Sequence, residues 1–275
     1  MSDAMPEKHK ETLLHNDTMH LTSWGQTGPK VVMVHGSAQG SRLGGERHFV
    51  AQRRLAEQGW QVIVPDRPGH GLTPCPGRPD DARADGQLVG ALMDDAGVHL
   101  VGHSFGGCVA LAAAADNPGR VRSLTLIEPA MAALAMDVPV VRRFGLQIVN
   151  VLFLSLSARS RIVRFMKLAN IPDDIGGHSS EDELRRMGRA ILRLKLPNRK
   201  TLAHQLATVR QAGVPVFVVS GGWSPAFEAI SERVAEVVGG RRLVIPSPHH
   251  FPQQVSDAFN EALDAFMRES DAKRP

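Results

Sequence analysis

The chain has 275 residues, 43% of them hydrophobic, so it is long enough to bury the core of one α/β domain that carries an insertion. Its 32 basic and 28 acidic residues leave a net charge of +4, which is too small and too dispersed to predict a nucleic-acid partner. The charged N-terminus lacks the apolar run of a secretory signal, and no segment has the roughly 18 apolar residues of a membrane span. We therefore expect a cytoplasmic protein that does not insert stably into a membrane.

Predicted strands and helices alternate along the first half of the chain. Apolar runs typical of buried strands cover residues 30–35, 61–65, 98–101 and 121–127. Helices are expected between them, over residues 46–58, 81–94 and 107–115. Such repeated strand–helix units predict an α/β protein whose mostly parallel, twisted sheet has helices on both faces.

The alternation stops after residue 129. Residues 130–212 have a helical pattern without a strand. It returns with predicted strands at 214–220 and 242–245 and predicted helices at 224–238 and 252–267. We interpret residues 1–129 and 213–275 as the core. Residues 130–212 are interpreted as an inserted all-helical cap over the carboxyl edge of the sheet, where open α/β sheets bind ligands.

The pentapeptide Gly102-His103-Ser104-Phe105-Gly106 lies between a predicted strand and a predicted helix. A serine between two glycines in this context is a nucleophile elbow, because so tight a turn needs glycine on both sides. The turn exposes the Ser104 hydroxyl at the carboxyl end of the sheet. It also directs the Phe105 N–H, at a helix N-terminus, toward a developing negative charge. The pattern predicts Ser104 as a catalytic nucleophile.

Three further segments carry recognisable motifs in the same order along the chain. They are His-Gly-Ser at 35–37, Asp-Arg-Pro-Gly-His-Gly at 66–71, and the loop Pro-Ser-Pro-His-His-Phe-Pro at 246–252. Together with the elbow and the helical cap, they make nearly the whole chain resemble the α/β-hydrolase superfamily. The resemblance implies an α/β-hydrolase fold, but it does not identify a substrate.

The resemblance also implies roles for individual residues. Ser104 corresponds to the nucleophile. His250 corresponds to the base, because it directly precedes the Phe-Pro pair that starts the last helix; the neighbouring His249 is the alternative. The backbone N–H groups of Ser37 and Phe105 are expected to form the oxyanion hole. Three histidines in these motifs are interpreted as structural residues: His35, His70 and His103.

The position of the catalytic acid departs from the family's usual pattern. The loop after the strand at 214–220 usually reads Gly-x-x-Asp, but this chain has Gly-Gly-Trp-Ser at 221–224, with a serine that suits a helix N-cap. Glu228, the nearest acid, should lie inside that helix and point away. Glu128 ends the strand before the cap, and Pro129 excludes helical geometry there, which predicts an extended turn. We predict Glu128 as the triad acid; the alternative is an N-cap or ion-pair residue at the cap entrance.

The cap contains a helix over residues 144–156 that is apolar on almost every side, so it is expected to be buried or to line an apolar pocket above Ser104. Its flanking arginines leave open contact with a membrane or with a second subunit, as in a homodimer formed through the cap. The arginines at 185, 186, 189 and 193 are interpreted as solvated helix surface, although an acyl-CoA or carrier-protein substrate would use such charge. The expected pocket residues are Gln39, Phe144, Phe153, Trp223 and Phe251.

These features favour a serine hydrolase that cleaves an ester, thioester or lactone of a small, largely apolar molecule through an acyl-enzyme. We expect no metal and no cofactor, since Cys75 and Cys108 fit neither a zinc site nor a disulfide framework. Serine at the elbow argues against haloalkane dehalogenases and epoxide hydrolases, which resemble this family but use aspartate there. C–C bond hydrolysis and cofactor-free oxygenation by the same triad stay open, as does a ligand-binding protein without turnover.

Overall fold

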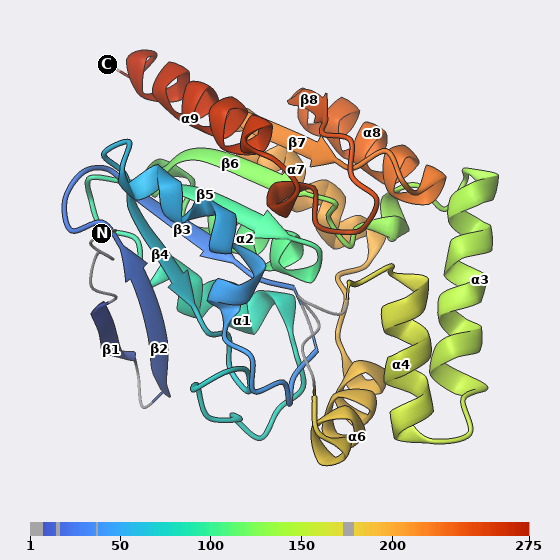
Figure 1. The fold of residues 1–275 in the computed structure, drawn as a ribbon. Helices are drawn as coiled ribbons and strands as arrows, with labels where there is room; N and C mark the ends of the chain where they lie inside the picture. Colours follow the sequence, from blue (N-terminus) through green and yellow to red (C-terminus); the bar gives the residue numbers. More distant parts are fainter. Residues whose placement is uncertain (1–7, 15–16, 37, 173–178, 275) are drawn as a thin grey trace.

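The computed structural model describes residues 8–14, 17–36, 38–172 and 179–274. They form an eight-stranded sheet in the order β1-β2-β4-β3-β5-β6-β7-β8 (Figure 1). The strands from β3 to β8 are parallel, whereas β1 and β2 pair antiparallel at one edge. The strands are β1 (Lys8–Leu14), β2 (Asp17–Trp24), β3 (Lys30–Val34), β4 (Gln61–Pro65), β5 (Val98–His103), β6 (Val121–Ile127), β7 (Val216–Ser220) and β8 (Arg241–Val244).

Helices connect the strands and form the cap. The α-helices are α1 (Ala82–Gly90), α2 (Phe105–Asp116), α3 (Pro139–Phe153), α4 (Ala158–Leu168), α6 (Glu181–Ala190), α7 (Arg199–Gln211), α8 (Pro225–Val238) and α9 (Asp257–Ala272). Short 3-10 helices are η1 (Gly45–His48), η2 (Val50–Ala56), η3 (Pro118–Arg120), η4 (Ala132–Leu134), η5 (Ile191–Arg193) and η6 (Pro252–Gln254).

The core lies on both faces of the sheet because successive side chains of a strand point to opposite sides. Val32 and Leu100 pack on one face with residues of α1, α2, α7 and α8. Val31 and Val101 pack on the other face with residues of η2 and α9. Burial on both faces explains why the parallel strands are nearly continuous apolar runs in the sequence.

Most predicted elements are present, with several differences, and the helix predicted at 252–267 is found as η6 followed by α9, which extends to Ala272. The strands predicted at 61–65 and 121–127 are found at those positions as β4 and β6. The helix predicted at 46–58 is instead the two 3-10 helices η1 and η2, and the helix predicted at 81–94 ends at Gly90. Strands β1 and β2 precede the first strand that the sequence pattern indicated.

The segment interpreted as the cap divides into two parts in space. Helices α3, α4 and α6 lie beyond the end of the sheet, to the lower right of Figure 1. Helix α7 contacts α2 and α8, and its buried Leu202, Leu206 and Val209 belong to the core cluster of the sheet. Helix α7 of the predicted cap at 130–212 therefore packs with the core, and the start of α3 contacts α8.

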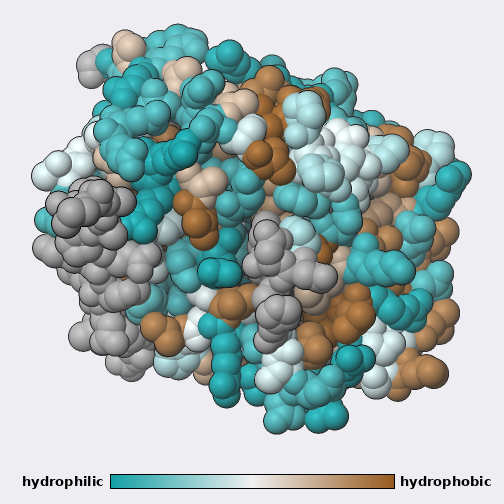
Figure 2. Space-filling model, in the orientation of Figure 1, coloured by the Kyte–Doolittle hydropathy of each residue, from teal (hydrophilic) through white to brown (hydrophobic). Residues whose placement is uncertain are grey.

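Helix α3 is far more exposed than its sequence predicted. Only Val141 and Val151 of this helix are buried, while Phe153 is 66% exposed and Leu146 is also 66% exposed. Apolar residues are visible on this side of the surface, at the right of Figure 2. No helix of the described residues is both long and apolar enough to cross a membrane.

The turn between β5 and α2 depends on Gly106. A Cβ atom at this position would lie 2.1 Å from the carbonyl oxygen of Val34 and 2.4 Å from that of His35. We expect Gly106→Ala to lower the free energy of unfolding by about 3 kcal/mol, because backbone atoms of β3 cannot move aside cheaply. Urea denaturation would measure this change.

Gly119→Ala is the matched control, since a Cβ there meets nothing within 4 Å. Its free energy of unfolding should stay within about 0.5 kcal/mol of the original chain. Equal stability of the two variants would contradict the close approach at the turn.

Candidate active site

Ser104 lies in a strained turn at the carboxyl end of β5. Its backbone has φ 56° and ψ −123°, a conformation that costs energy for a residue with a side chain. Glycine before and after Ser104 lets the backbone of the turn approach itself closely. A Cβ at Gly102 would lie 2.5 Å from the carbonyl oxygen of Gly106. The backbone therefore has the geometry expected of a nucleophile elbow.

Glu128 and His250 meet although 122 residues separate them in the sequence. A Glu128 carboxylate oxygen lies 2.5 Å from His250 Nδ1, and both side chains are at least 95% buried. A carboxylate bonded to Nδ1 fixes the imidazole so that Nε2 is free to accept a proton. This is the contact that the sequence predicted between the two residues.

The loop after β7, which lacks the aspartate of the family's usual pattern, donates hydrogen bonds to the Glu128 carboxylate. Gly221 N–H donates to Glu128 Oε1 at 2.8 Å, and Trp223 Nε1 lies 3.0 Å from each carboxylate oxygen. Trp223 thus contacts the acid, and the prediction that it lines the substrate pocket is wrong. The extended turn predicted at Glu128 is also wrong, because its φ is 40°.

The competing residues are engaged elsewhere. Glu228 accepts hydrogen bonds from Ser220 and the Gly222 N–H and pairs with Arg242, so it stays away from the histidine loop. His249 Nδ1 accepts from the Phe251 N–H at 3.2 Å and organises the loop.

An apolar pocket of about 260 Å³ opens above the elbow. Ser104, Phe105 and His250 line it together with residues of α3, α4, η5 and α8. Its main apolar lining residues are Phe144, Ile148, Leu152, Phe165, Leu194 and Phe251. Among the described residues no hydrogen bond joins the Ser104 hydroxyl to His250; in free enzymes such bonds are often long and tighten with substrate.

Two of the five predicted pocket residues, Phe144 and Phe251, line this pocket. Phe153 is exposed at the end of α3 and does not, because the helix turns that side toward solvent. Gln39 lies at a different cleft: its backbone N–H donates to Asp80 and its side chain donates to the Pro68 carbonyl. The sequence analysis placed both residues at the pocket above Ser104, and neither lines it.

Three residues that the sequence analysis did not assign to the site support it. His48 lines the pocket near His103. Asn170, at the end of α4, accepts a hydrogen bond from the His250 N–H at 3.3 Å and donates one to the Pro248 carbonyl. His103 Nε2 donates to the His250 carbonyl at 2.7 Å, so His103 helps to hold the loop that carries His250. No motif in the sequence indicates these long-range contacts.

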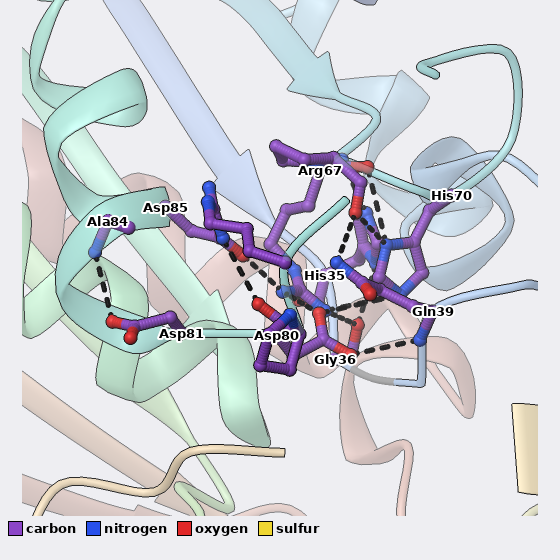
Figure 3. Close-up of polar contacts among 12 residues, drawn as sticks. His35, Gly36, Gln39, Arg67, His70, Asp80, Asp81, Ala84 and Asp85 are labelled. Carbon is purple, nitrogen blue, oxygen red and sulfur yellow. Dashed lines mark hydrogen bonds and ion pairs between the residues drawn. The ribbon is translucent and has the colours of Figure 1, made fainter. Parts of the chain in front are cut away.

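A buried arginine holds the segment before the predicted oxyanion residue Ser37. Arg67 is fully buried, and Figure 3 shows its side chain among Asp80, Asp85 and the 35–36 backbone. Its Nη1 lies 2.8 Å from Asp80 and 2.7 Å from Asp85, while Nε and Nη2 donate to the carbonyls of His35 and Gly36. Each of these carboxylates and carbonyls thereby has a hydrogen-bond partner within the protein.

One predicted donor of the oxyanion hole lies at the start of α2. Phe105 is the first residue of α2, so its N–H has no partner within the helix and lies at the positive end of the helix dipole. Ser37, the other predicted donor, lies outside the described residues.

A family model described as alpha/beta hydrolase fold matches residues 29–152. This part of the chain therefore resembles the α/β-hydrolase family, and the sheet and helices described above form an α/β-hydrolase fold. It is 35% identical over 120 residues to Lipase LipV of Mycobacterium tuberculosis, with 42% of each chain covered. It is 33% identical over 121 residues to a 2-hydroxy-6-oxo-6-phenylhexa-2,4-dienoate hydrolase of Burkholderia cepacia, with 42% of this chain and 41% of that protein covered. These matches span about two fifths of the length of either relative.

Solved structures are similar over the whole chain. A mutant of the N-acyl homoserine lactonase AidH, complexed with N-hexanoyl homoserine, superposes with a TM-score of 0.72 at 19% sequence identity. The alignment covers 98% of this chain and 99% of the lactonase. The similarity extends the α/β-hydrolase fold beyond residue 152, through the helical cap and the histidine loop.

Buried neutral histidines should make stability depend on pH. Burial, with the nearby positive charge of Arg67, lowers the pKa of His70 to about 4, and burial lowers that of His48 to about 3. Below about pH 6.5 these rings take up protons in the unfolded chain but not in the folded one, so stability falls as the pH drops from about 6.5 to about 4. Each ring should cost about 2 kcal/mol between pH 7 and pH 5, as measured by urea denaturation.

His70→Gln should reduce this pH-dependent loss by roughly the contribution of one ring. His204→Gln, an exposed histidine on α7, should leave the loss unchanged. The same pH dependence in all three proteins would contradict the role of the buried rings.

Proposed function

We propose that this chain is a serine hydrolase that cleaves an ester, thioester or lactone of a largely apolar molecule. The observation that carries the proposal is the 2.5 Å hydrogen bond between Glu128 and His250 Nδ1, at a pocket that Ser104 also lines. A nucleophile in an elbow, a base and an acid that orients the base are the parts that acyl transfer needs.

The reaction would proceed in two halves. Ser104 Oγ attacks the carbonyl carbon of the substrate while His250 Nε2 takes the hydroxyl proton. The Phe105 N–H stabilises the negative charge on the carbonyl oxygen, and Glu128 stabilises the imidazolium. His250 then gives the proton to the leaving group as the acyl-enzyme forms. Water, deprotonated by His250, attacks the acyl carbon and releases the acid and Ser104.

The pocket favours an apolar acyl group of modest size. Its volume is about 260 Å³, and its lining is dominated by phenylalanine, leucine, isoleucine and alanine side chains from the core and the cap. Burying each methylene of an acyl chain there would contribute about 0.8 kcal/mol to binding.

C–C bond hydrolysis is the second candidate function. The observation that favours it is the 33% identity to a relative named as a dienoate hydrolase. A ligand-binding protein without turnover would need none of the hydrogen bonds that orient His250.

The exposed apolar residues of α3 support a further proposal about assembly. Leu146, Val149 and Phe153 are each more than half exposed, and such a surface suits a homodimer formed through the cap.

The first test of the proposed function is Ser104→Ala. Hydrolysis of a chain-length series of p-nitrophenyl esters and of lactones should fall at least about 10⁴-fold, because among the described residues that line the pocket only Ser104 carries a hydroxyl that could form the acyl-enzyme. Far-ultraviolet circular dichroism should remain unchanged. A variant with the original rate would remove Ser104 as nucleophile, and failure of the original chain to react with a fluorophosphonate would favour the ligand-binding alternative.

Glu128→Gln tests the position of the acid. The amide keeps the shape of the carboxylate but cannot stabilise the imidazolium, so kcat should fall on the order of 10⁴-fold, as for triad aspartates. Glu228→Gln, at the competing acid, should leave kcat nearly unchanged once thermal unfolding shows that the variant is folded. The opposite ranking of the two variants would place the acid at residue 228.

A further inference from the structure

A second cleft, of about 590 Å³, lies between the cap and the loops of the core. Five arginines line it and no carboxylate does, among the described residues. Arg186, Arg189 and Arg193 come from the α6–η5 segment of the cap, Arg42 from the loop after β3, and Arg78 from the loop before α1. We call it the arginine cleft.

Most of this positive charge has no counter-charge among the described residues. Arg78 pairs with Asp85, but the side chains of the other four arginines have no ion pair or hydrogen bond within the described part of the chain. On the same helix, Arg185 faces away and pairs with Asp182 and Glu181. The unpaired guanidinium groups thus share one cleft, whereas the paired one lies outside it.

The core wall of the cleft is well ordered by its own contacts. Buried Glu183 accepts a hydrogen bond from the Arg42 N–H at 2.7 Å, which ties the loop after β3 to α6. The Gly40 N–H donates to the Gly69 carbonyl at 2.8 Å, and the Gly71 N–H donates to the Ser41 carbonyl at 3.0 Å. Both walls are therefore held at a fixed separation before any ligand arrives.

A small cavity lies between the arginine cleft and the apolar pocket and shares lining residues with both. This cavity of about 50 Å³ shares Gly36 and His48 with the apolar pocket and Ser41 with the arginine cleft. Helix α6 divides the two regions: Met187 faces the small cavity, and its neighbour Arg186 faces the cleft. A substrate with an apolar acyl end, a thin linker and a multiply charged anionic end matches this arrangement.

We propose that the arginine cleft binds the phosphate groups of an acyl-coenzyme A thioester whose acyl group occupies the apolar pocket. One guanidinium group can donate two parallel hydrogen bonds to the oxygens of a phosphate. Coenzyme A carries a diphosphate and a phosphomonoester in one flexible molecule. The inference rests on the proposed hydrolase function, because it assigns the leaving group of that reaction. Ser104 Oγ bonds to the thioester carbon, the C–S bond breaks, and the thiol leaves with the proton from His250; water then releases the carboxylic acid.

Calorimetry tests the site without relying on turnover. Coenzyme A should bind the original chain, and the Arg186→Ala/Arg189→Ala double variant should bind it at least about 30-fold more weakly, since each charge-assisted contact contributes about tenfold or more. Arg42→Ala, on the opposite wall, should weaken binding about tenfold. The matched control is Arg185→Ala, which removes the same charge from the same helix and should change binding less than about twofold.

Three smaller ligands show which phosphate groups the cleft binds: dephospho-coenzyme A, pantetheine and inorganic pyrophosphate. Pantetheine should not bind, and loss of affinity for dephospho-coenzyme A would assign part of the cleft to the phosphomonoester. Binding of pyrophosphate as tight as that of coenzyme A would overturn the proposal in favour of a free-anion site. Equal weakening by Arg185→Ala would overturn it in favour of non-specific charge attraction.

Kinetics separate this inference from the proposed function. The original chain should cleave hexanoyl-coenzyme A with a kcat/KM at least about tenfold above that for hexanoyl-pantetheine, and the double variant should lose this preference. Its rate on p-nitrophenyl hexanoate, which has no phosphate, should stay unchanged. Ester cleavage without coenzyme A binding would overturn the arginine cleft alone. Coenzyme A binding without cleavage of any ester or thioester would overturn the hydrolase.

Discussion

A buried carboxylate at the end of β6 sets the requirements for the rest of the active site. Glu128 is fully buried, and an ionised carboxylate in such a place must receive hydrogen bonds from the protein. Gly221, Trp223 and His250 provide them, from two loops that follow different strands. The loop after β7 therefore supplies hydrogen-bond donors to the Glu128 carboxylate. Gly221 fits this role because a Cβ there would lie 3.0 Å from Glu128 Oε1.

A second buried charge organises the opposite side of the elbow. Arg67 satisfies Asp80 and Asp85 and also holds the carbonyls of His35 and Gly36, directly before the predicted oxyanion residue (Figure 3). Such a buried network favours a rigid arrangement, since removing Arg67 would leave two buried carboxylates without their main partner. The neutral ring of His35 completes it: Nε2 accepts from the Arg67 N–H while Nδ1 donates to the Gly36 carbonyl.

The cap presents three different surfaces to its surroundings. Residues such as Ile148 and Leu152 face the apolar pocket over Ser104, while Phe153 on the same helix faces solvent. The arginines of α6 form the third surface, on the far side of Met187 from the pocket. Helices α3 and α6 thus line apolar and charged environments that lie close to each other beside Ser104.

The sequence by itself determined the elements whose signal is local. Apolar runs identified β4 and β6, and glycines flanking Ser104 identified the strained turn, because only glycine fits beside the backbone of β3 there. The contact between Glu128 and His250 was also predictable from the sequence, because the carboxyl ends of parallel strands lie at one edge of the sheet. Tertiary structure alone decided what these residues touch: the indole of Trp223 on the acid, the Asn170 contact with the histidine loop, and the outward turn of Phe153. It also brought Arg42 and Arg78 to the arginines of α6, which looked like ordinary helix surface in the sequence. Periodicity reports which side of an element is apolar, but only packing fixes which neighbour each side meets.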